Sequence, residues 1–377
     1  MLKKTGVLLL LLVLLSVNIY NTNYVKASSL PRVDAAAAAV VDVDTGQVLY
    51  NHRMNHKLPP ASTTKILTTI IAIEEGELNE MVTVSRRAAY QEGSSIWLQE
   101  GEKLPLEDLL YGVMLASGND AAVAVAEHIS GSVKKFSELM NKRAKEIGAT
   151  NSNFLNPSGL PQSGHYSTAH DLAMIMRYAL KNDIFARITS TKYKTISWPG
   201  KEWDRGLRNH NKLLWKYPDI TGGKTGYTRA AGRCLVASAK RDNRHVVAVV
   251  LNCPNDWVEI RKLLDYGLNN FKKIRYIKKG QVLRTLEWTR SREKTFKLVT
   301  GEDLDIVVPE GGSIKIKKEI VLNPDITLPI NKGDVVGELI LYSGQRIIGK
   351  ADVISGNDLN FNSIFLRFWH KISSRDN

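Results

Sequence analysis

The sequence predicts a mixed α/β domain followed by a small all-β domain. Three observations lead to this fold class. Strand patterns flank a long region of helical patterns, at about residues 35–50 and 220–253. Near residue 270 the composition changes, and short alternating apolar runs replace the helical patterns. A chain of 377 residues is also long enough to bury two separate cores.

The first 27 residues have the organisation of a secretory signal peptide. Two lysines precede an apolar run at residues 7–15, and Ala27 is followed by two serines. The run is shorter than the ~20 apolar residues that a membrane span needs, so we expect cleavage after Ala27 rather than an uncleaved anchor. We therefore expect an exported protein on the cell-wall side of the cytoplasmic membrane. For such a protein, the net charge of +14 favours anionic wall polymer or lipid as a partner, not nucleic acid.

The α/β domain begins with strands and continues as helices. Residues 35–50, AAAAAVVDVDTGQVLY, indicate a strand, an Asp-Thr-Gly turn and a second strand. A helix is expected after Thr168, because Thr168 and Asp171 resemble a capping box and apolar residues at helical spacing follow. Residues 151–164 are rich in Gly, Pro, Asn and Ser, which predicts a loop.

Strand patterns return near residue 220, and a last helix closes the domain. The runs GRCLVASAK and HVVAVVLNC flank a charged turn at residues 241–244, which predicts two strands of one hairpin. Cys234 and Cys253 lie in these runs. Two cysteines are too few for a disulfide framework, and a single bridge between them remains an open alternative. Apolar periodicity at residues 258–271 predicts the helix.

The chain beyond residue 270 predicts a β-rich domain and an amphipathic tail. Residues 272–297 carry ten Lys or Arg against two Glu, and short runs separated by Gly, Pro and Asn follow. We assign residues 28–270 to the first domain, 271–356 to the β-rich domain and 357–377 to the tail. We expect the tail to bind a membrane surface, with docking on its own domain as the alternative. Its predicted helical stripe consists of Phe361, Ile364, Phe365, Phe368, Trp369 and Ile372.

Three short motifs in one order indicate nucleophilic catalysis. Each motif is weak alone, since Ser-x-x-Lys occurs three times in the chain and Ser-Gly-Asn and Lys-Thr-Gly twice each. Only one set has the order Ser-x-x-Lys, Ser-x-Asn, Lys-Thr-Gly with each motif in a suitable local setting. Its members are Ser62 and Lys65, Ser117 and Asn119, and Lys224, Thr225 and Gly226.

The first motif pairs a nucleophile with a base. The Pro-Pro pair at residues 59–60 predicts an extended segment, so that a helix begins near Ala61 and places Ser62 and Lys65 on one face. Lowering the ordinary lysine pKa of ~10.4 by ~3 units takes ~4 kcal/mol. A helix terminus supplies at most ~2 kcal/mol. Desolvation and a second cation, Lys224, must therefore supply the rest.

The other two motifs suit substrate binding and proton transfer. Ser117 and Asn119 lie at a break between apolar segments, where Ser117 can shuttle a proton and Asn119 can hold a peptide carbonyl. Lys224 and Thr225 can bind a carboxylate. Gly226 lets a substrate backbone lie close to its strand.

These motifs resemble those of the low-molecular-mass penicillin-binding proteins, the serine D-alanyl-D-alanine carboxypeptidases of peptidase family S11. The resemblance covers roughly residues 30–360. It includes PPASTTK, a Ser-Gly-Asn variant in place of Ser-Asp-Asn, the loop NPSGLPQSGHYSTAHDLA and the strand GGKTGYT. The fold that it implies is a β-lactamase/transpeptidase-like domain, an antiparallel sheet flanked by helices, with a β-rich domain after it.

The resemblance also implies an activity. It implies removal of the terminal D-alanine from the peptidoglycan pentapeptide through a Ser62 acyl-enzyme, with Lys65 as the base and β-lactams as covalent inhibitors. The implied oxyanion hole consists of the backbone N–H groups of Ser62 and Tyr227. Lys224, Thr225, Gly226 and Tyr227 would bind the substrate, and no metal or cofactor is implied.

Several other functions remain alternatives. A β-lactamase would share the three motifs. By resemblance, class A β-lactamases use a Glu in a Glu-x-Glu-Leu-Asn-like loop after the second motif, and here the only such segment, residues 75–79, precedes that motif. A D,D-endopeptidase would use the same chemistry, and a catalytically silent wall-binding module would be expected to lack one of the chemical groups. A metallopeptidase would need a Glu between His52 and His56, and none is present there. The sequence also contains no Gly-x-Ser-x-Gly motif, which weakens a hydrolase of the Ser-His-Asp type.

Overall fold

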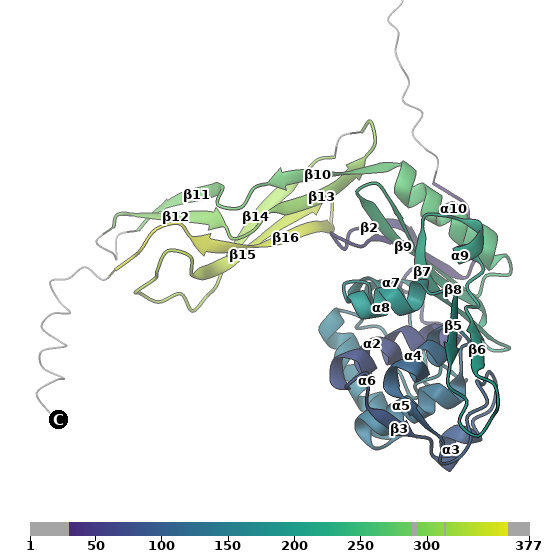
Figure 1. Cartoon of the computed structure of the whole chain (residues 1–377). Coiled ribbons are helices and arrows are strands. Elements are labelled where there is room, and N and C mark those ends of the chain that lie inside the picture. Colours follow the sequence, from purple (N-terminus) through teal and green to yellow (C-terminus); the bar gives the residue numbers. More distant parts are fainter. Residues whose placement is uncertain (1–29, 289–292, 313, 361–377) are drawn as a thin grey trace, which may run out of the picture. The chain divides into compact units, whose positions relative to one another are not determined.

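A computed structural model describes residues 30–288, 293–312 and 314–360 (Figure 1). The predicted signal peptide at residues 1–27 and the apolar stripe predicted from Phe361 onward lie outside the described residues. No helix in the described ranges is both long and apolar enough to span a bilayer.

The first domain is built on a five-stranded antiparallel sheet with strand order β2-β1-β9-β8-β7. Strands from the two ends of the domain meet in this sheet, because β1 pairs with β9. The predicted hairpin at residues 241–244 joins β8 to β9 near the middle of the sheet. The edge strand β7 contains the Lys-Thr-Gly motif. The strands are β1 (Ala37–Asp42), β2 (Val48–His52), β7 (Ile220–Thr228), β8 (Gly232–Arg241) and β9 (Arg244–Leu251).

The sheet is buried on both faces, and the alternation of side chains along each strand explains how. In β1, Ala37, Ala39 and Val41 pack in a core with the helices of residues 61–190. The intervening Ala38 and Val40 pack on the other face against α10 (Asp256–Asn269). Successive side chains of a strand point to opposite faces, so an unbroken apolar run buries both.

The helical region lies between β2 and β7 in the sequence. Its longer helices carry apolar residues at helical spacing, and α7 begins as predicted, because the Thr168 side chain accepts a hydrogen bond from the Asp171 N–H. Residues 151–164 form a loop, as predicted. The helices are η1 (Ala61–Thr64), α2 (Lys65–Glu75), α3 (Arg86–Ala89), α4 (Leu106–Met114), α5 (Asn119–Ser130), α6 (Val133–Ile147), α7 (Ala169–Ala179), α8 (Asp183–Ser190) and α9 (Leu213–Lys216).

Two small two-stranded antiparallel sheets accompany the helices. One pairs β3 (Met81–Thr83) with β4 (Lys103–Pro105), with α3 between them in the sequence, and the other is a hairpin of β5 (Tyr193–Ile196) and β6 (Arg205–Arg208). The hairpin precedes the Lys-Thr-Gly strand in the sequence and contributes side chains near it, as described below.

The C-terminal part of the described chain is all-β, as the sequence predicts. Its strands form a two-stranded sheet, β10-β13, and a five-stranded antiparallel sheet, β11-β12-β16-β15-β14, around a separate apolar core. The strands are β10 (Phe271–Ile277), β11 (Val282–Glu287), β12 (Thr295–Thr300), β13 (Leu304–Pro309), β14 (Lys317–Leu322), β15 (Val335–Ser343) and β16 (Arg346–Ser355).

The two cysteines are free and buried, so the structure does not contain the bridge that the sequence left open. The reason is geometric. Cys234 packs in the core on the helical face of the sheet, and Cys253 packs in the core on the α10 face. Burial raises the pKa of the Cys234 thiol to about 11 and that of Cys253 to about 12.

These positions predict the behaviour of both thiols toward a thiol-specific reagent. The thiolate is the form that attacks such a reagent. Because both groups are buried with raised pKa values, the native protein should react slowly at neutral pH. In the unfolded protein, two thiols should react with the reagent without addition of any reductant. An intact mass two hydrogens lower than the reduced chain would contradict this arrangement.

Candidate active site

Ser62 and Lys65 lie at the turn that begins α2, a largely buried helix of the first domain. The sequence predicted an extended segment at the Pro-Pro pair, and this detail is wrong: Pro60 has φ −84° and ψ −10°. The chain instead turns at Ala61, whose φ is +47°. Left-handed backbone is costly for a residue with a Cβ. The turn places Ser62 in the short helix η1, half-buried and one turn before Lys65.

The amine of Lys65 has no exposed surface and is held by three oxygen atoms. Its Nζ lies 3.0 Å from Ser62 Oγ, 2.6 Å from Asn119 Oδ1 and 2.9 Å from the carbonyl oxygen of Ser158. These oxygens come from three parts of the chain: η1, the start of α5 and the loop at residues 151–164. An ammonium can donate to all three oxygens. A neutral amine can donate to two of them and accept a hydrogen bond from the Ser62 hydroxyl.

The pKa of Lys65 is lowered well below its usual value. Burial is the largest cause, because charge is costly away from water, and the positive charge of Lys224 acts in the same direction. The carboxylate of Asp120 partly opposes both effects. The amine is therefore shifted toward the neutral form that a base requires.

Lys224 is the second buried cation of the site. It lies on β7 with 1% of its surface exposed, and its Nζ donates to the carbonyl oxygen of Thr225 at 3.0 Å. Burial lowers the pKa of Lys224 to about 7. Near neutral pH this group is therefore partly charged, and an incoming carboxylate would favour its charged form.

Ser117 lies between α4 and α5, and Asn119 is the first residue of α5, at the predicted break between apolar segments. Ser117 is nearly buried and has a left-handed φ of +62°. The Asn119 side chain is oriented from both ends: its Oδ1 accepts from Lys65 at 2.6 Å and its Nδ2 donates to the carbonyl oxygen of Glu92 at 2.7 Å. The second N–H of this amide remains for a ligand.

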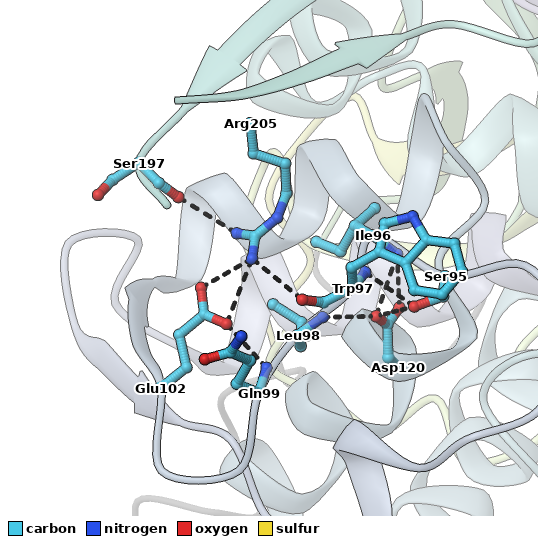
Figure 2. Close-up of polar contacts among 9 residues, drawn as sticks. All are labelled: Ser95, Ile96, Trp97, Leu98, Gln99, Glu102, Asp120, Ser197 and Arg205. Carbon is cyan, nitrogen blue, oxygen red and sulfur yellow. Dashed lines mark hydrogen bonds and ion pairs between the residues drawn. The ribbon is translucent and has the colours of Figure 1, made fainter. Parts of the chain in front are cut away.

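The loop next to Asn119 is fixed by a carboxylate that sequence reasoning missed. Asp120 is fully buried in the first turn of α5. Its side chain accepts from the Ser95 hydroxyl at 2.6 Å and from the backbone N–H groups of Ile96 and Leu98 at 3.0 and 3.1 Å (Figure 2). An acidic residue directly after a loop motif, at the start of an apolar helix, was the available signal.

A buried ion pair fixes the far end of the same loop. Arg205 of β6 donates to Glu102 at 3.0 Å, to the carbonyl oxygen of Trp97 at 3.3 Å and to that of Ser197 at 3.2 Å (Figure 2). The side chains of Arg205 and Glu102 are 4% and 3% exposed, so both charges are shielded from water. Trp97 itself has a left-handed φ of +62°, which these contacts maintain.

The glycine of the Lys-Thr-Gly motif packs against the Ser62 turn. A Cβ added to Gly226 would lie 3.0 Å from the backbone nitrogen of Ser62 and 3.1 Å from Ala61 Cβ. A side chain there would crowd the Ser62 N–H. Thr225, next to it, is half-buried, and the Tyr227 side chain is 67% exposed, so the Tyr227 side chain points away from this contact.

The structure thus brings Ser62, Lys65 and Asn119 into hydrogen-bond contact and places Lys224 within electrostatic range of Lys65. Within the described ranges, no hydrogen bond joins the Ser117 hydroxyl or Lys224 to Ser62. The sequence missed Ser158, because a backbone carbonyl acts there and any residue type supplies one. It also gave no role to His165. That ring is buried against Thr64 Oγ1 at 3.1 Å, and burial lowers its pKa to about 4, so it is neutral and structural.

Comparison with known proteins agrees with this arrangement. Residues 24–255 match the protein family described as D-alanyl-D-alanine carboxypeptidase. Residues 271–360 match the family described as Penicillin-binding protein 5, C-terminal domain.

Individual proteins are similar over most of the chain. D-alanyl-D-alanine carboxypeptidase DacF of Bacillus subtilis is 36% identical over 337 residues, 86% of each chain. DacC of Escherichia coli is 32% identical over 357 residues, 90% of this chain and 88% of its own. The crystal structure of penicillin-binding protein 5 from Haemophilus influenzae superposes with a TM-score of 0.74 at 30% identity and covers 88% of this chain and 98% of that one.

Two glycines in the loop at residues 151–164 provide a matched test of the packing at Ser62. Both have left-handed φ values, +82° at Gly159 and +87° at Gly164. A Cβ on Gly159 would lie 1.8 Å from the carbonyl oxygen of Ala61, whereas the nearest atom to one on Gly164 is 3.6 Å away. We expect Gly164→Ala to cost roughly 1 kcal/mol of unfolding free energy, and Gly159→Ala a further ~1–3 kcal/mol with loss of Ser62 reactivity.

Denaturant unfolding and labelling of each variant by a fluorescent penicillin measure these effects. Equal stability and equal labelling of the two variants would contradict a tight contact between Gly159 and the turn that carries Ser62.

Proposed function

Because the chain belongs to the D-alanyl-D-alanine carboxypeptidase family, peptidase family S11, we propose that it removes the terminal D-alanine of peptidoglycan pentapeptides through an acyl-enzyme on Ser62. The observation that carries the proposal is the 3.0 Å contact between Ser62 Oγ and a fully buried Lys65 amine. It pairs a nucleophile with a base whose pKa is lowered by its surroundings.

Acylation follows from these positions. The neutral Lys65 amine accepts the Ser62 proton as Oγ attacks the carbonyl carbon between the last two D-alanines. The backbone N–H groups of Ser62 and Tyr227 stabilise the resulting oxyanion. As the C–N bond breaks, the Ser117 hydroxyl gives its proton to the leaving amine and takes the proton held by Lys65, so that the Lys65 amine is neutral again and D-alanine departs. A water molecule then hydrolyses the ester and restores Ser62.

Substrate binding falls to the groups around this centre. The free carboxylate of the terminal D-alanine suits the Lys224 ammonium and the Thr225 hydroxyl, since charge-assisted hydrogen bonds are the stronger ones. Asn119 offers its remaining N–H to a peptide carbonyl. Gly226 leaves room for the substrate backbone beside β7, because it has no side chain. A β-lactam would acylate Ser62 in the same way.

We also propose where the protein acts and how its parts divide. Residues 28–270 would form the catalytic domain and 271–356 the β-rich domain, after removal of a signal peptide at residues 1–27. The exported enzyme would face the cell wall, with residues 357–377 binding the outer surface of the cytoplasmic membrane. The charged n-region and apolar run at the N-terminus and the Phe- and Trp-rich stripe of the tail support this assignment.

The chain offers its own control for the nucleophile. Ser132 and Lys135 form another Ser-x-x-Lys match, but the Ser132 side chain caps α6 by accepting from the Lys135 N–H. We expect Ser62→Ala to abolish both penicillin labelling and D-alanine release. Ser132→Ala should retain both and lose only ~1 kcal/mol of stability with the cap.

Peptide mapping of the labelled wild-type protein identifies the acylated residue. Labelling that survives in Ser62→Ala would contradict the proposal. Rapid turnover of penicillin by the wild type would instead favour a β-lactamase.

The pH dependence of acylation tests the role of Lys224. The charge of Lys224 lowers the pKa of Lys65, so its removal in Lys224→Gln should raise that pKa. At a given pH a smaller fraction of the Lys65 amine is then neutral, so the acidic limb of the penicillin acylation rate should move to higher pH. Lys135→Gln, which removes an exposed lysine of the other match, should leave the limb in place. A limb that moves to lower pH in Lys224→Gln would contradict this coupling.

A further inference from the structure

One exposed arginine lies against two aromatic rings that also contact each other. Arg208 of β6 stands opposite Tyr193 of β5 in the hairpin register. Its guanidinium carbon lies 5.8 Å from the centre of the Tyr193 ring and 5.2 Å from that of Trp215 on α9. The two rings contact each other edge to face, with centroids 6.1 Å apart. Such contacts fix a flexible cation in one place.

This arginine is exposed and forms no ion pair in the part of the chain that the structure describes. The same holds for Lys216, which with Arg208 and Trp215 lines an open groove of about 460 Å³. Lys212 also lines the groove, but it interacts electrostatically with Asp256. No acidic residue contributes to the groove lining; the other two lining residues are Asn209 and His210.

The groove is linked to the site around Ser62 through two of its lining residues, Asn209 and His210. The backbone N–H of His210 donates to the carbonyl oxygen of Leu115, two residues before Ser117. The Asn209 amide donates to the carbonyl oxygens of Thr189 and Thr191. Thr189 in turn accepts from the N–H of Gly223, next to Lys224. The segment that carries Arg208 is thus hydrogen-bonded directly to the segment that leads to Ser117, and through Thr189 to the strand that carries Lys224.

We propose that Arg208 binds a carboxylate of the substrate on the N-terminal side of the scissile bond, which makes it a specificity-determining residue. The inference rests on the proposed function and extends it by naming a second recognised group. A guanidinium presents two parallel N–H donors that match a carboxylate, and one already fixed by its neighbours loses little freedom on binding. Charge complementarity selects this ligand, because the groove offers cations and an aromatic wall.

A pair of peptides that differ only in this group tests the proposal. Both are pentapeptides ending in D-Ala-D-Ala, with a γ-linked D-glutamyl residue whose α-carboxylate is free in one and amidated in the other. The wild type should prefer the free carboxylate by roughly tenfold in kcat/KM, mainly through KM. Arg208→Ala should reduce this ratio to about one. Arg208→Lys, which retains the charge without the two-donor geometry, should give an intermediate ratio.

The control variant is Arg284→Ala, which removes an exposed arginine from β11 of the other domain and should keep the wild-type ratio. A wild-type ratio of one overturns the inference while D-alanine release upholds the proposed function. Equal losses on both peptides in Arg208→Ala, with the ratio retained, also overturn it, since that pattern indicates a structural role. If the wild type releases D-alanine from neither peptide and takes no penicillin label, the proposed function fails and this inference with it.

Discussion

The burial of one amine is the constraint on which the site depends. Lys65 has no exposed surface, so every hydrogen bond that its Nζ makes must come from the protein. Those bonds come from Ser62, Asn119 and the carbonyl oxygen of Ser158, which belong to segments far apart in the sequence. A shift of any of these segments would leave a buried polar group without a partner. The cost of that loss fixes the geometry around Ser62.

Two charged groups act on this buried amine. Lys224 disfavours a charge on Lys65, and Asp120 favours one, so the amine is held between two opposing fields. Asp120 has a second effect, because its bonds to Ile96 and Leu98 fix the loop that contacts Asn119 (Figure 2). The Arg205–Glu102 pair fixes the end of that loop. Reactivity and rigidity thus share one polar network.

Recognition by Arg208 would be independent of this network. Its guanidinium is positioned by ring contacts and remains open to water, whereas the groups around Ser62 are positioned by burial. A solvated cation can select a substrate without perturbing the pKa of Lys65. Changes confined to Arg208 and to the rings of Tyr193 and Trp215 would therefore alter substrate preference while the chemistry at Ser62 stays the same.

The sequence by itself determined the features that are local or periodic. They are the apolar run of β1, the Thr168 cap, the all-β character beyond residue 270 and the three short motifs. Each depends on neighbours within a few residues or on spacing along one element. Only the tertiary structure decided the rest. The left-handed turn at Ala61, the carbonyl of Ser158 and the two cysteine environments arise where distant segments meet. Such contacts depend on how elements pack in space, and the spacing of residues along a chain does not encode that packing directly.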